Sequence, residues 1–590
     1  MKKIINSPDT VVSEMCRGFA LAHPAVELDE AYHILHKRDI DQEKVTLICG
    51  GGSGHEPAHG GYIGEGLLDA AVCGDVFASP SKIQVYQAIR RTKSRKGTLL
   101  IIKNYSGDMM NFTNAMEMAR EDGIAVDYVR VDDDIAVQDS LYTVGRRGVA
   151  GTVFIHKIAG AAAAAGMSLP EVKAIAEEAV RNVKSLGFAL TSCTVPAKGS
   201  PTFELGEDEI EFGVGIHGEP GIRREKLISA DQMAERMVSA LLAELPEEGR
   251  TEGLALLVNG FGGTPLQELY LLANSAAEQL QKHNCRIQRV LVGNFLTSID
   301  MAGASISLMG LDPQRRDLLN AACDAPALHI TGSAVPQLRK AADPAAEAAA
   351  APSWTVESPD SWALVHNDRI TLENLIYMVD CMSQIIIQNE VPFCELDSHA
   401  GDGDFGMSVA KGFQQLKLQW RDLLDNHSKT MGQFLDRASL IIMEHCGGAS
   451  GPIWGSAFRA ASRFVWEREE LDLSAFAGML QAAVRGIYKT GERSFGRGAV
   501  VGDKTLMDAL IPCADSLSAS AAQGVALTKA MKLAAAAAVE GADSTSKIVA
   551  RMGRAGTVGE RSLGYPDAGA YALGVIFTQL ADQLRTAEEA

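Results

Sequence analysis

The chain has 590 residues, of which 46% are hydrophobic, and a formal net charge of −19. This length exceeds what one hydrophobic core serves, so two to four domains are expected. The acidic balance argues against nucleic acid and anionic membranes as partners, and no apolar run reaches the roughly 18 residues that cross a bilayer.

The first half of the chain alternates short strand-like segments with longer helical patterns. Strands are predicted at residues 45–49, 98–102, 188–191, 210–214, 254–259 and 289–292. A helical pattern at 169–184 is one of several that separate them. This alternation predicts an α/β domain.

Many of these strands run directly into glycine or polar clusters. The clusters lie at residues 50–55, 103–108, 217–221 and 260–264. Because ligands of α/β sheets gather at the carboxyl ends of strands, the clusters predict one small-molecule site.

Two histidines and an ion pair are the candidate reactive groups of this site. His55 ends the first cluster, and His217 precedes Gly218 on a loop. A lone loop histidine is more often structural than catalytic. Lys103 and Asp108 flank a tight turn, where they serve either in proton transfer or as an ordinary ion pair.

The segment 55–59 also matches the H-E-x-x-H pattern of zinc proteases. That motif needs an uninterrupted helix so that both imidazoles share one face. Pro57 directly follows a glycine run and is incompatible with such a helix. We therefore reject zinc proteolysis and expect a loop whose N–H groups and histidine face a small ligand.

Composition changes beyond residue 332. Residues 333–361 are rich in Ala and Pro and predict a linker between a domain at 1–332 and a domain at 362–590. Leu372, Leu375, Ile376 and Val379 then keep helical spacing, and strand patterns disappear. The second domain is predicted to be all-helical.

The most informative stretch is residues 396–406, which brings Asp397, Asp402 and Asp404 into one glycine-punctuated loop. Three neighbouring carboxylates repel one another unless a hard cation lies between them, and oxygen ligands suit Mg²⁺ or Ca²⁺. A solvated acidic turn is the alternative. The loop lacks the closing Glu of an EF-hand, the preceding strand of a dinucleotide site and the H-R-D partner of a kinase D-F-G triplet.

The same domain carries further glycine loops at residues 447–452, 502–505 and 559–569, and an arginine at 554. The second loop is not a P-loop, because Asp503 separates Gly502 from Lys504. Carboxylates for a metal, glycine loops and an arginine together indicate a nucleoside triphosphate site.

Taken in order, these motifs resemble one family, the single-chain ATP-dependent dihydroxyacetone kinases, in which a ketose-binding K-domain is fused to a nucleotide-binding L-domain. The K-domain resemblance rests on GGGSGHEPAHGGYIG, IIKNYSGD, DSLYTVGRRGVAGT, EFGVGIHGEPG and VGNFLTSIDMAG. The L-domain resemblance rests on LDSHAGDGDFG, GGASGP, GDKTLMDAL and GRAGTVGERSLGYPDAGA. It implies an α/β K-domain of two subdomains, a helical-barrel L-domain and a cytoplasmic homodimer. Ten separate cysteines without a C-x-x-C pair and a start without a signal-peptide core agree with that location.

The resemblance also implies residue roles. His217 would hold the ketose as a covalent hemiaminal, with His55 and Asp108 assisting proton transfer. The residues implied to line the ketose site are Gly52, Ser53, Gly54, His55, Lys103 and Asp108. Asp397, Asp402 and Asp404 would hold Mg²⁺ against the ATP phosphates. The residues implied to contact the nucleotide are Phe405, Gly406, Met407, Ser408, Ala449, Ser450, Gly498, Leu506, Arg554, Asp567, Ala568 and Gly569.

The substrate and the phosphate source leave alternatives open. Met109, Met110 and Gly60 depart from the family pattern near the ketose motifs, so erythrulose or another small ketose is the second expectation. A ketose-sensing regulator is disfavoured by the complete Asp trio and by the fused second domain. A phosphoenolpyruvate relay needs a phosphohistidine partner, and this sequence carries no recognisable domain of that kind.

Overall fold

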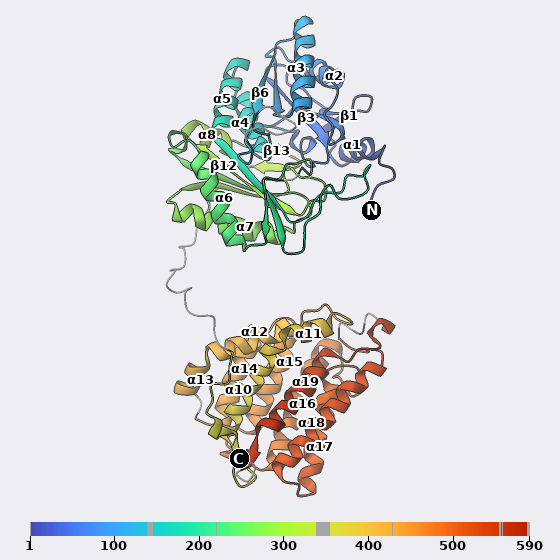
Figure 1. Ribbon diagram of the computed structural model, residues 1–590, viewed down its shortest axis with the longest axis vertical. Helices are drawn as coiled ribbons and strands as arrows, with labels where there is room; N and C mark the ends of the chain where they lie inside the picture. Colours follow the sequence, from blue (N-terminus) through green and yellow to red (C-terminus); the bar gives the residue numbers. More distant parts are fainter. Residues whose placement is uncertain are drawn as a thin grey trace. The chain divides into compact units, whose positions relative to one another are not determined.

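The computed structural model describes residues 2–137, 145–219, 221–337, 354–427, 429–553, 556 and 559–586. The chain divides into two compact units, Met1–Asp343 and Pro344–Ala590 (Figure 1). Most of the predicted linker, residues 338–353, lies outside the described residues. Glu357 and Ser358 belong to the linker predicted from the Ala and Pro content of the sequence. Their backbone N–H groups donate hydrogen bonds to Asp380 in the second unit.

The first unit contains two six-stranded sheets. The first sheet has the order β1-β2-β4-β3-β5-β6, and its last four strands run parallel. Its strands are β1 Val26–Asp29, β2 Ile34–Lys37, β3 Thr46–Ser53, β4 Ala70–Val76, β5 Thr98–Lys103 and β6 Val126–Val131.

The second sheet has the order β11-β10-β12-β7-β8-β9 and is antiparallel except for the β10-β11 pair. Its strands are β7 Val183–Ala189, β8 Glu209–Phe212, β9 Arg223–Lys226, β10 Gly253–Gly260, β11 Ile287–Gly293 and β12 Gly303–Leu311. A short hairpin, β13 Cys323–Ala325 with β14 Leu328–Ile330, lies apart from both sheets.

Helices cover both sheets in layers (Figure 1). Those of this unit are α1 Val11–Ala22, α2 Lys82–Thr92, α3 Ser106–Glu121, α4 Thr152–Ala164, α5 Leu169–Arg181, α6 Ala230–Glu244, α7 Leu266–Lys282 and α8 Pro313–Asn320. Helices α2 and α3 pack on one face of the first sheet, and α6 and α7 pack on the second sheet. Helix α4 is buried along almost its whole length in a core shared by both sheets.

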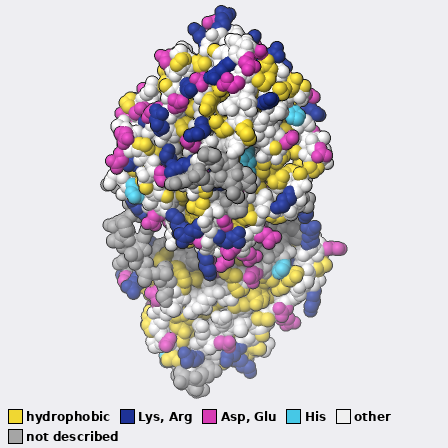
Figure 2. All heavy atoms as spheres, turned by 45° about the horizontal axis from the view of Figure 1, so that its top comes forward, with side chains coloured by type: hydrophobic (Ala, Val, Ile, Leu, Met, Phe, Trp, Pro, Cys, Tyr) yellow, Lys and Arg dark blue, Asp and Glu magenta, His cyan; other side chains and the backbone are white. Residues whose placement is uncertain are grey.

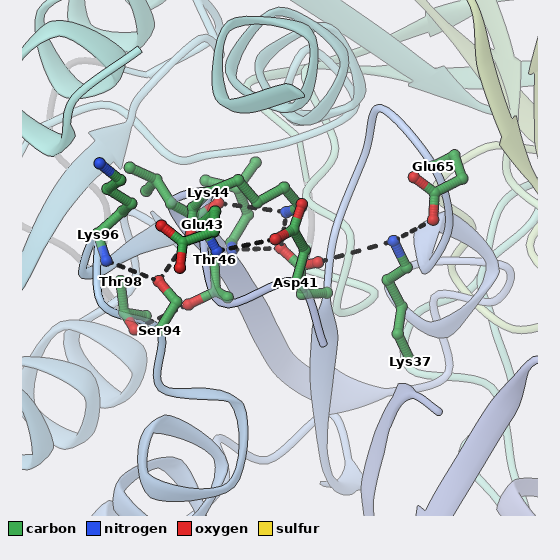
Figure 3. A network of polar contacts seen from close by, with 12 residues as sticks. Lys37, Asp41, Glu43, Lys44, Thr46, Glu65, Ser94, Lys96 and Thr98 are labelled. Atoms are coloured by element: carbon green, nitrogen blue, oxygen red, sulfur yellow. Dashed lines mark hydrogen bonds and ion pairs between the residues drawn. The ribbon is translucent and has the colours of Figure 1, made fainter. Parts of the chain in front are cut away.

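The amino ends of β3 and β5 are joined by polar contacts, some of which Figure 3 draws. Lys44 Nζ donates to Asp69 at 2.6 Å, the hydroxyls of Thr46 and Thr98 lie 2.9 Å apart, and Ser94 Oγ donates to the Lys44 carbonyl at 2.6 Å. These contacts satisfy, within the protein, the polar groups at the amino ends of the strands. The glycine clusters lie at the opposite, carboxyl ends, where α/β sheets bind ligands.

The described part of the second unit is built mainly from helices. They are α10 Leu372–Gln388, α11 Glu390–Asp397, α12 Phe405–Leu418, α13 Trp420–His427, α14 Met431–His445, α15 Ser450–Phe464, α16 Leu473–Phe495, α17 Met507–Ala522, α18 Leu527–Ser544 and α19 Ala568–Gln583. Four two-residue strands pair as β15 Leu364–Val365 with β18 Arg585–Thr586 and β16 Ile370–Thr371 with β17 Glu470–Leu471. One large apolar core runs through these helices.

The predicted fold class, an α/β unit followed by an all-helical unit, is confirmed. Several predicted boundaries were wrong, three of them as follows. The helix predicted to reach residue 184 ends at Arg181. Strand β7 starts at Val183, five residues before the start of the predicted strand at 188. Strand β8 ends at Phe212 because Gly213 turns the chain with φ +75°.

On the face seen in Figure 2, Lys and Arg side chains are interspersed with Asp and Glu side chains. Among the described residues of that face, basic side chains form no extended patch. None of the described helices is both long enough and apolar enough to span a bilayer.

Candidate active site

His217 lies on the loop that follows β8, where its ring is held by a carboxylate. Its backbone N–H donates to Glu219 Oε2 at 2.8 Å, and its Nδ1 lies 3.3 Å from Glu219 Oε1. Because a carboxylate only accepts, Nδ1 carries the proton and Nε2 keeps its lone pair. Gly218 is required between them: it adopts φ +71°, and a Cβ there would lie 2.6 Å from Cys193 Sγ.

The charge of Glu219 is maintained despite burial. Burial opposes ionisation of this carboxyl, but the hydrogen bond from His217 and the charge that this ring carries when protonated, together with the charge of Arg147, lower its pKa to about 2. Arg147 is itself buried and paired with Asp134 at 2.7 Å. A permanent anion therefore lies behind the His217 ring.

Three rings surround the imidazole of His217. The ring centroids of Tyr105, His55 and Phe77 lie 4.6, 4.9 and 5.2 Å from that of His217. His55 also stacks on Phe77 at 5.2 Å. Residues from both sheets thus meet at one point, which the separate clusters of the sequence predicted.

His55 is fully buried and neutral. Its Nδ1 lies 2.8 Å from the carbonyl oxygen of Thr297, so Nδ1 carries the proton, while Nε2 has no hydrogen-bond partner among the described residues. Burial, reinforced by the charge that His217 carries when protonated and by the charge of Lys103, holds the pKa of His55 well below 6.5. A buried acceptor of this kind suits a hydroxyl proton of a bound ligand.

Lys103 and Asp108 lie beneath the glycine loop. Lys103 Nζ donates to the Gly50 carbonyl at 2.8 Å, lies 2.9 Å from His59 Nε2 and lies 3.6 Å from Asp108 Oδ2. Asp108, in the first turn of α3, also accepts a hydrogen bond from Ser79. The side chain of Lys103 is 1% exposed, so it supports the loop from inside.

The predicted ketose loop itself packs tightly. A Cβ on Gly52 would lie 2.7 Å from the backbone at Phe77 and Ala78. Ser53 Oγ donates to the Gly74 carbonyl at 2.7 Å, and the Gly54 N–H donates to the carboxylate of Glu56 at 3.1 Å. The 55–59 segment is not helical, and the imidazoles of His55 and His59 have different partners, as the rejection of a zinc protease predicted.

The three unusual residues near this loop do not contact His217. Met109 packs into the core between α2, α3 and the first sheet, and Met110 is 61% exposed. Gly60 faces Leu35, whose Cδ1 would lie 2.8 Å from a Cβ at that position.

The second unit contains a cavity of about 210 Å³ bordered by the acidic loop. Helices α12, α15 and α19 begin at its wall, with Phe405, Ser450 and Ala568 as their first residues. The dipoles of three helix N-termini, whose positive ends lie at this wall, favour bound anions. The arrangement suits a polyphosphate ligand.

The acidic loop contributes oxygen ligands at the same cavity. Asp397 is the last residue of α11, Asp404 is the N-cap of α12, and Asp402 is exposed between them. One carboxylate oxygen from each lies within 4.8 Å of the others. Oxygens that share one Mg²⁺ lie about 3 to 4 Å apart, so small side-chain movements suffice for this trio to hold the ion.

Glycine is required for this loop to close. A Cβ on Gly401 would lie 2.2 Å from Asp397 Oδ1, and Gly403 adopts φ +76°. Asp397 Oδ2 in turn accepts the Phe405 N–H at 3.3 Å. The glycines therefore allow the carboxylates to converge on the helix terminus.

Most of the predicted nucleotide residues line this cavity. Those that do are Phe405, Ser408, Ala449, Ser450, Leu506, Asp567, Ala568 and Gly569. Gly406 packs against the backbone of α11, Met407 donates its N–H to Cys394 Sγ at 3.2 Å, and Gly498 lies against the Tyr488 ring. Arg554 lies outside the described residues.

Two residues of these sites were missed by sequence reasoning. Glu219 was considered only as part of the cluster at residues 217–221, although its spacing of two from His217 is the available signal. Lys504 was considered only as a failed P-loop lysine, yet it borders the cavity beside the acidic loop.

Comparisons with known proteins agree with this geometry. Family models describe a Dak1 domain at residues 17–327 and a DAK2 domain at residues 399–582. The chain is 33% identical to "Triokinase/FMN cyclase" of Rattus norvegicus, over 99% of each chain. It is 32% identical to "L-erythrulose 1-kinase" of Mycolicibacterium smegmatis, over 99% of this chain and 100% of that protein.

Among solved structures, the dihydroxyacetone kinase from C. freundii in complex with AMP-PNP and Mg²⁺ matches with a TM-score of 0.59 and 31% identity. The match covers 98% of this chain and 99% of that one. The chain belongs to the dihydroxyacetone kinase family. It is a kinase, and ATP with Mg²⁺ is the cofactor pair of this class.

Proposed function

We propose that this kinase phosphorylates dihydroxyacetone to dihydroxyacetone phosphate while His217 holds the ketose as a covalent hemiaminal. The observation that carries the proposal is the pairing of His217 Nδ1 with Glu219, which leaves Nε2 as a nucleophile inside a pocket of three rings. Nitrogen nucleophiles of this kind add to carbonyl carbons.

The addition step balances with the groups at hand. The Nε2 lone pair forms a bond to the carbonyl carbon, and the π electrons of the carbonyl move to its oxygen, which takes up a proton from solvent. The imidazole ring becomes positive, and the Glu219 anion offsets that charge. His55 Nε2 accepts a hydrogen bond from a substrate hydroxyl, and Asp108 is the second candidate for proton transfer.

The covalent bond supplies orientation and selectivity together. A triose offers few hydrogen bonds, so a tether fixes its reactive hydroxyl better than weak contacts do. Glycerol has no carbonyl and cannot form the adduct. A kinase that works in this way accepts ketoses and rejects the corresponding polyol.

The nucleotide half of the reaction is assigned to the cavity in the second unit. Asp397, Asp402 and Asp404 would hold Mg²⁺, which neutralises charge on the ATP phosphates when bound. The N-termini of α12, α15 and α19 would bind the phosphate oxygens through backbone N–H groups. Phosphoryl transfer requires mainly this positioning and charge neutralisation.

The second candidate substrate is erythrulose or another small ketose. It is favoured by the similarity to the L-erythrulose 1-kinase over almost the whole chain. Incubating the protein with [γ-³²P]ATP and dihydroxyacetone, erythrulose, glyceraldehyde or glycerol decides between them through kcat/KM. Labelling of glycerol at the rate of the ketoses contradicts the covalent mechanism.

A phosphoenolpyruvate relay and a ketose-sensing regulator are less favoured functions. Both domains of the family lie in this one chain, and the acidic trio needed for Mg²⁺ is complete. ATP labelling in the absence of any partner protein distinguishes the kinase from both. Because the two half-sites lie in separate units, we further propose a homodimer in which the chains cooperate in transfer.

A further inference from the structure

Lys504 borders the nucleotide cavity, but its ammonium group points into a cage of backbone carbonyls. Nζ donates to the carbonyl oxygens of Thr545 and Tyr565 at 2.8 Å, of Ile548 at 3.3 Å, and of Ser562. The residue is 1% exposed. Backbone carbonyl oxygens around one positive charge are also the ligands that a channel filter offers to K⁺, although the filter supplies more of them.

The backbone at Lys504 is fixed in a conformation that L-residues rarely adopt. Its φ is +61°, in the left-handed region that favours glycine. The carboxylate of Asp508 holds this turn by accepting the Gly502 N–H at 2.6 Å and the Thr505 N–H at 2.8 Å. The loop thus maintains an unfavourable conformation that directs the lysine inward.

The cage connects to the residues that line the nucleotide cavity. Thr545, whose carbonyl binds Lys504, accepts the Asp567 N–H on its hydroxyl at 2.8 Å. Asp567 caps α19 by accepting the Ala570 N–H at 2.8 Å. Loss of the ammonium would therefore leave the start of α19 without its support.

The cage also connects to the acidic loop. The ring of Tyr565 stacks on His399 with centroids 3.8 Å apart and planes 8° apart. His399 lies between Asp397 and Asp402, which are two of the three candidate metal ligands. The Tyr565 carbonyl that accepts from Lys504 therefore belongs to the residue packed on this loop.

We propose that Lys504 is a positioning residue of the nucleotide site. Its ammonium group acts as a built-in monovalent cation that keeps Thr545 and Asp567 in place beside the acidic loop. It binds no phosphate, because its donors are directed at the four carbonyls. The proposal rests on the assignment of ATP to this cavity. Its distinctive consequence is that a free cation of similar size can replace the ammonium group.

The experiment compares Lys504→Ala, which opens the cage, with Lys504→Met, which fills it with an uncharged chain. We expect both variants to weaken Mg-ATP binding about tenfold or more by calorimetry, because each loses the charge-assisted hydrogen bonds that fix the cage, and a hydrogen bond to a charged group contributes about 1.5 to 3 kcal/mol. KM for ATP should rise more than kcat falls. About 100 mM K⁺ or NH₄⁺ should restore most of the affinity of Lys504→Ala, whereas choline should not. Lys504→Met and the wild type should not respond.

Two matched lysines serve as controls. Lys417 is also buried in this unit, but it pairs with Asp380 and Glu357, so Lys417→Met should lower stability without cation rescue of ATP affinity. Lys529 is exposed, and Lys529→Met should behave as wild type. All five tryptophans lie beyond residue 353, so their fluorescence reports whether the second unit of each variant is folded.

Wild-type affinity and KM in folded Lys504→Ala overturn the proposal, and so does a loss that K⁺ and NH₄⁺ both fail to restore. If the alanine variant does not fold, Lys504→Gln takes its place in the experiment, because its side-chain amide retains two N–H donors without the charge. It should bind Mg-ATP with intermediate affinity, and wild-type affinity there overturns the proposal as well. Asp402→Asn separates the two ideas: normal Mg-ATP binding in that variant refutes the nucleotide assignment itself.

Discussion

Replacing Glu219 by glutamine tests how His217 is activated. The substitution keeps the size of the side chain and an oxygen that can accept the His217 N–H, but it removes the buried negative charge. Adduct formation leaves the His217 ring positive, so the carboxylate is more strongly bound to the adduct than to the free imidazole. Glu219→Gln should therefore disfavour the adduct.

The magnitude follows from the environment of the carboxylate. The pKa of Glu219, about 2 against an ordinary value of 4.5, shows that the carboxylate remains ionised beside His217. A hydrogen bond to a charged group contributes about 1.5 to 3 kcal/mol. We expect the ketose concentration for half-maximal adduct to rise roughly 10- to 100-fold.

The assay is a titration with dihydroxyacetone read by intact-protein mass spectrometry. Glu211→Gln is the matched control, because Glu211 is equally buried but pairs with Arg224 at 3.0 Å and has no hydrogen bond to His217. The control should titrate as wild type. An unchanged titration in folded Glu219→Gln would refute the proposed activation of His217.

Three further outcomes are expected. Asp402→Asn should weaken Mg-ATP binding by calorimetry with little change in ketose adduct, and normal nucleotide affinity would count against the metal assignment. Burial, with the charge of Lys103, lowers the pKa of His156 to about 3, whereas the unfolded chain takes up this proton near 6.5. His156 alone should therefore lower the free energy of unfolding of the first unit by about 1.4 kcal/mol per pH unit below 6.5, and urea denaturation of His156→Gln between pH 7 and pH 5 should lack this contribution. A mixture of His217→Ala and Asp402→Asn chains should regain activity if the chains of a homodimer cooperate, and a mixture as inactive as its parents excludes transfer between chains.

The fold class was readable from the sequence because local patterns determine it. A few neighbouring residues are enough to encode a short strand that ends in glycine or a helix that begins with a capping box. Examples of such boxes are Ser81 with Gln84 and Ser229 with Gln232. The loss of strand patterns after the Ala/Pro-rich segment likewise marked the all-helical unit. Sheet order was not readable, because β3 lies between β4 and β5 through pairings distant in sequence.

The sites were only partly readable for the same reason. The acidic trio lies within eight residues, so its convergence could be predicted from spacing. The tautomer of His55 depends on Thr297, 242 residues away, and the cage around Lys504 depends on carbonyls 41 to 61 residues away. Such contacts leave no local pattern, since backbone carbonyls carry no sequence signature.

The central claim is tested most directly by the intact mass of the protein after incubation with dihydroxyacetone. A hemiaminal retains every atom of the ketose, so the wild type should gain the full mass of one dihydroxyacetone, and His217→Ala should gain none. A Schiff base on a lysine such as Lys103 would instead add that mass less one water. An increment lacking a water, or a full increment that persists in His217→Ala, would contradict the account.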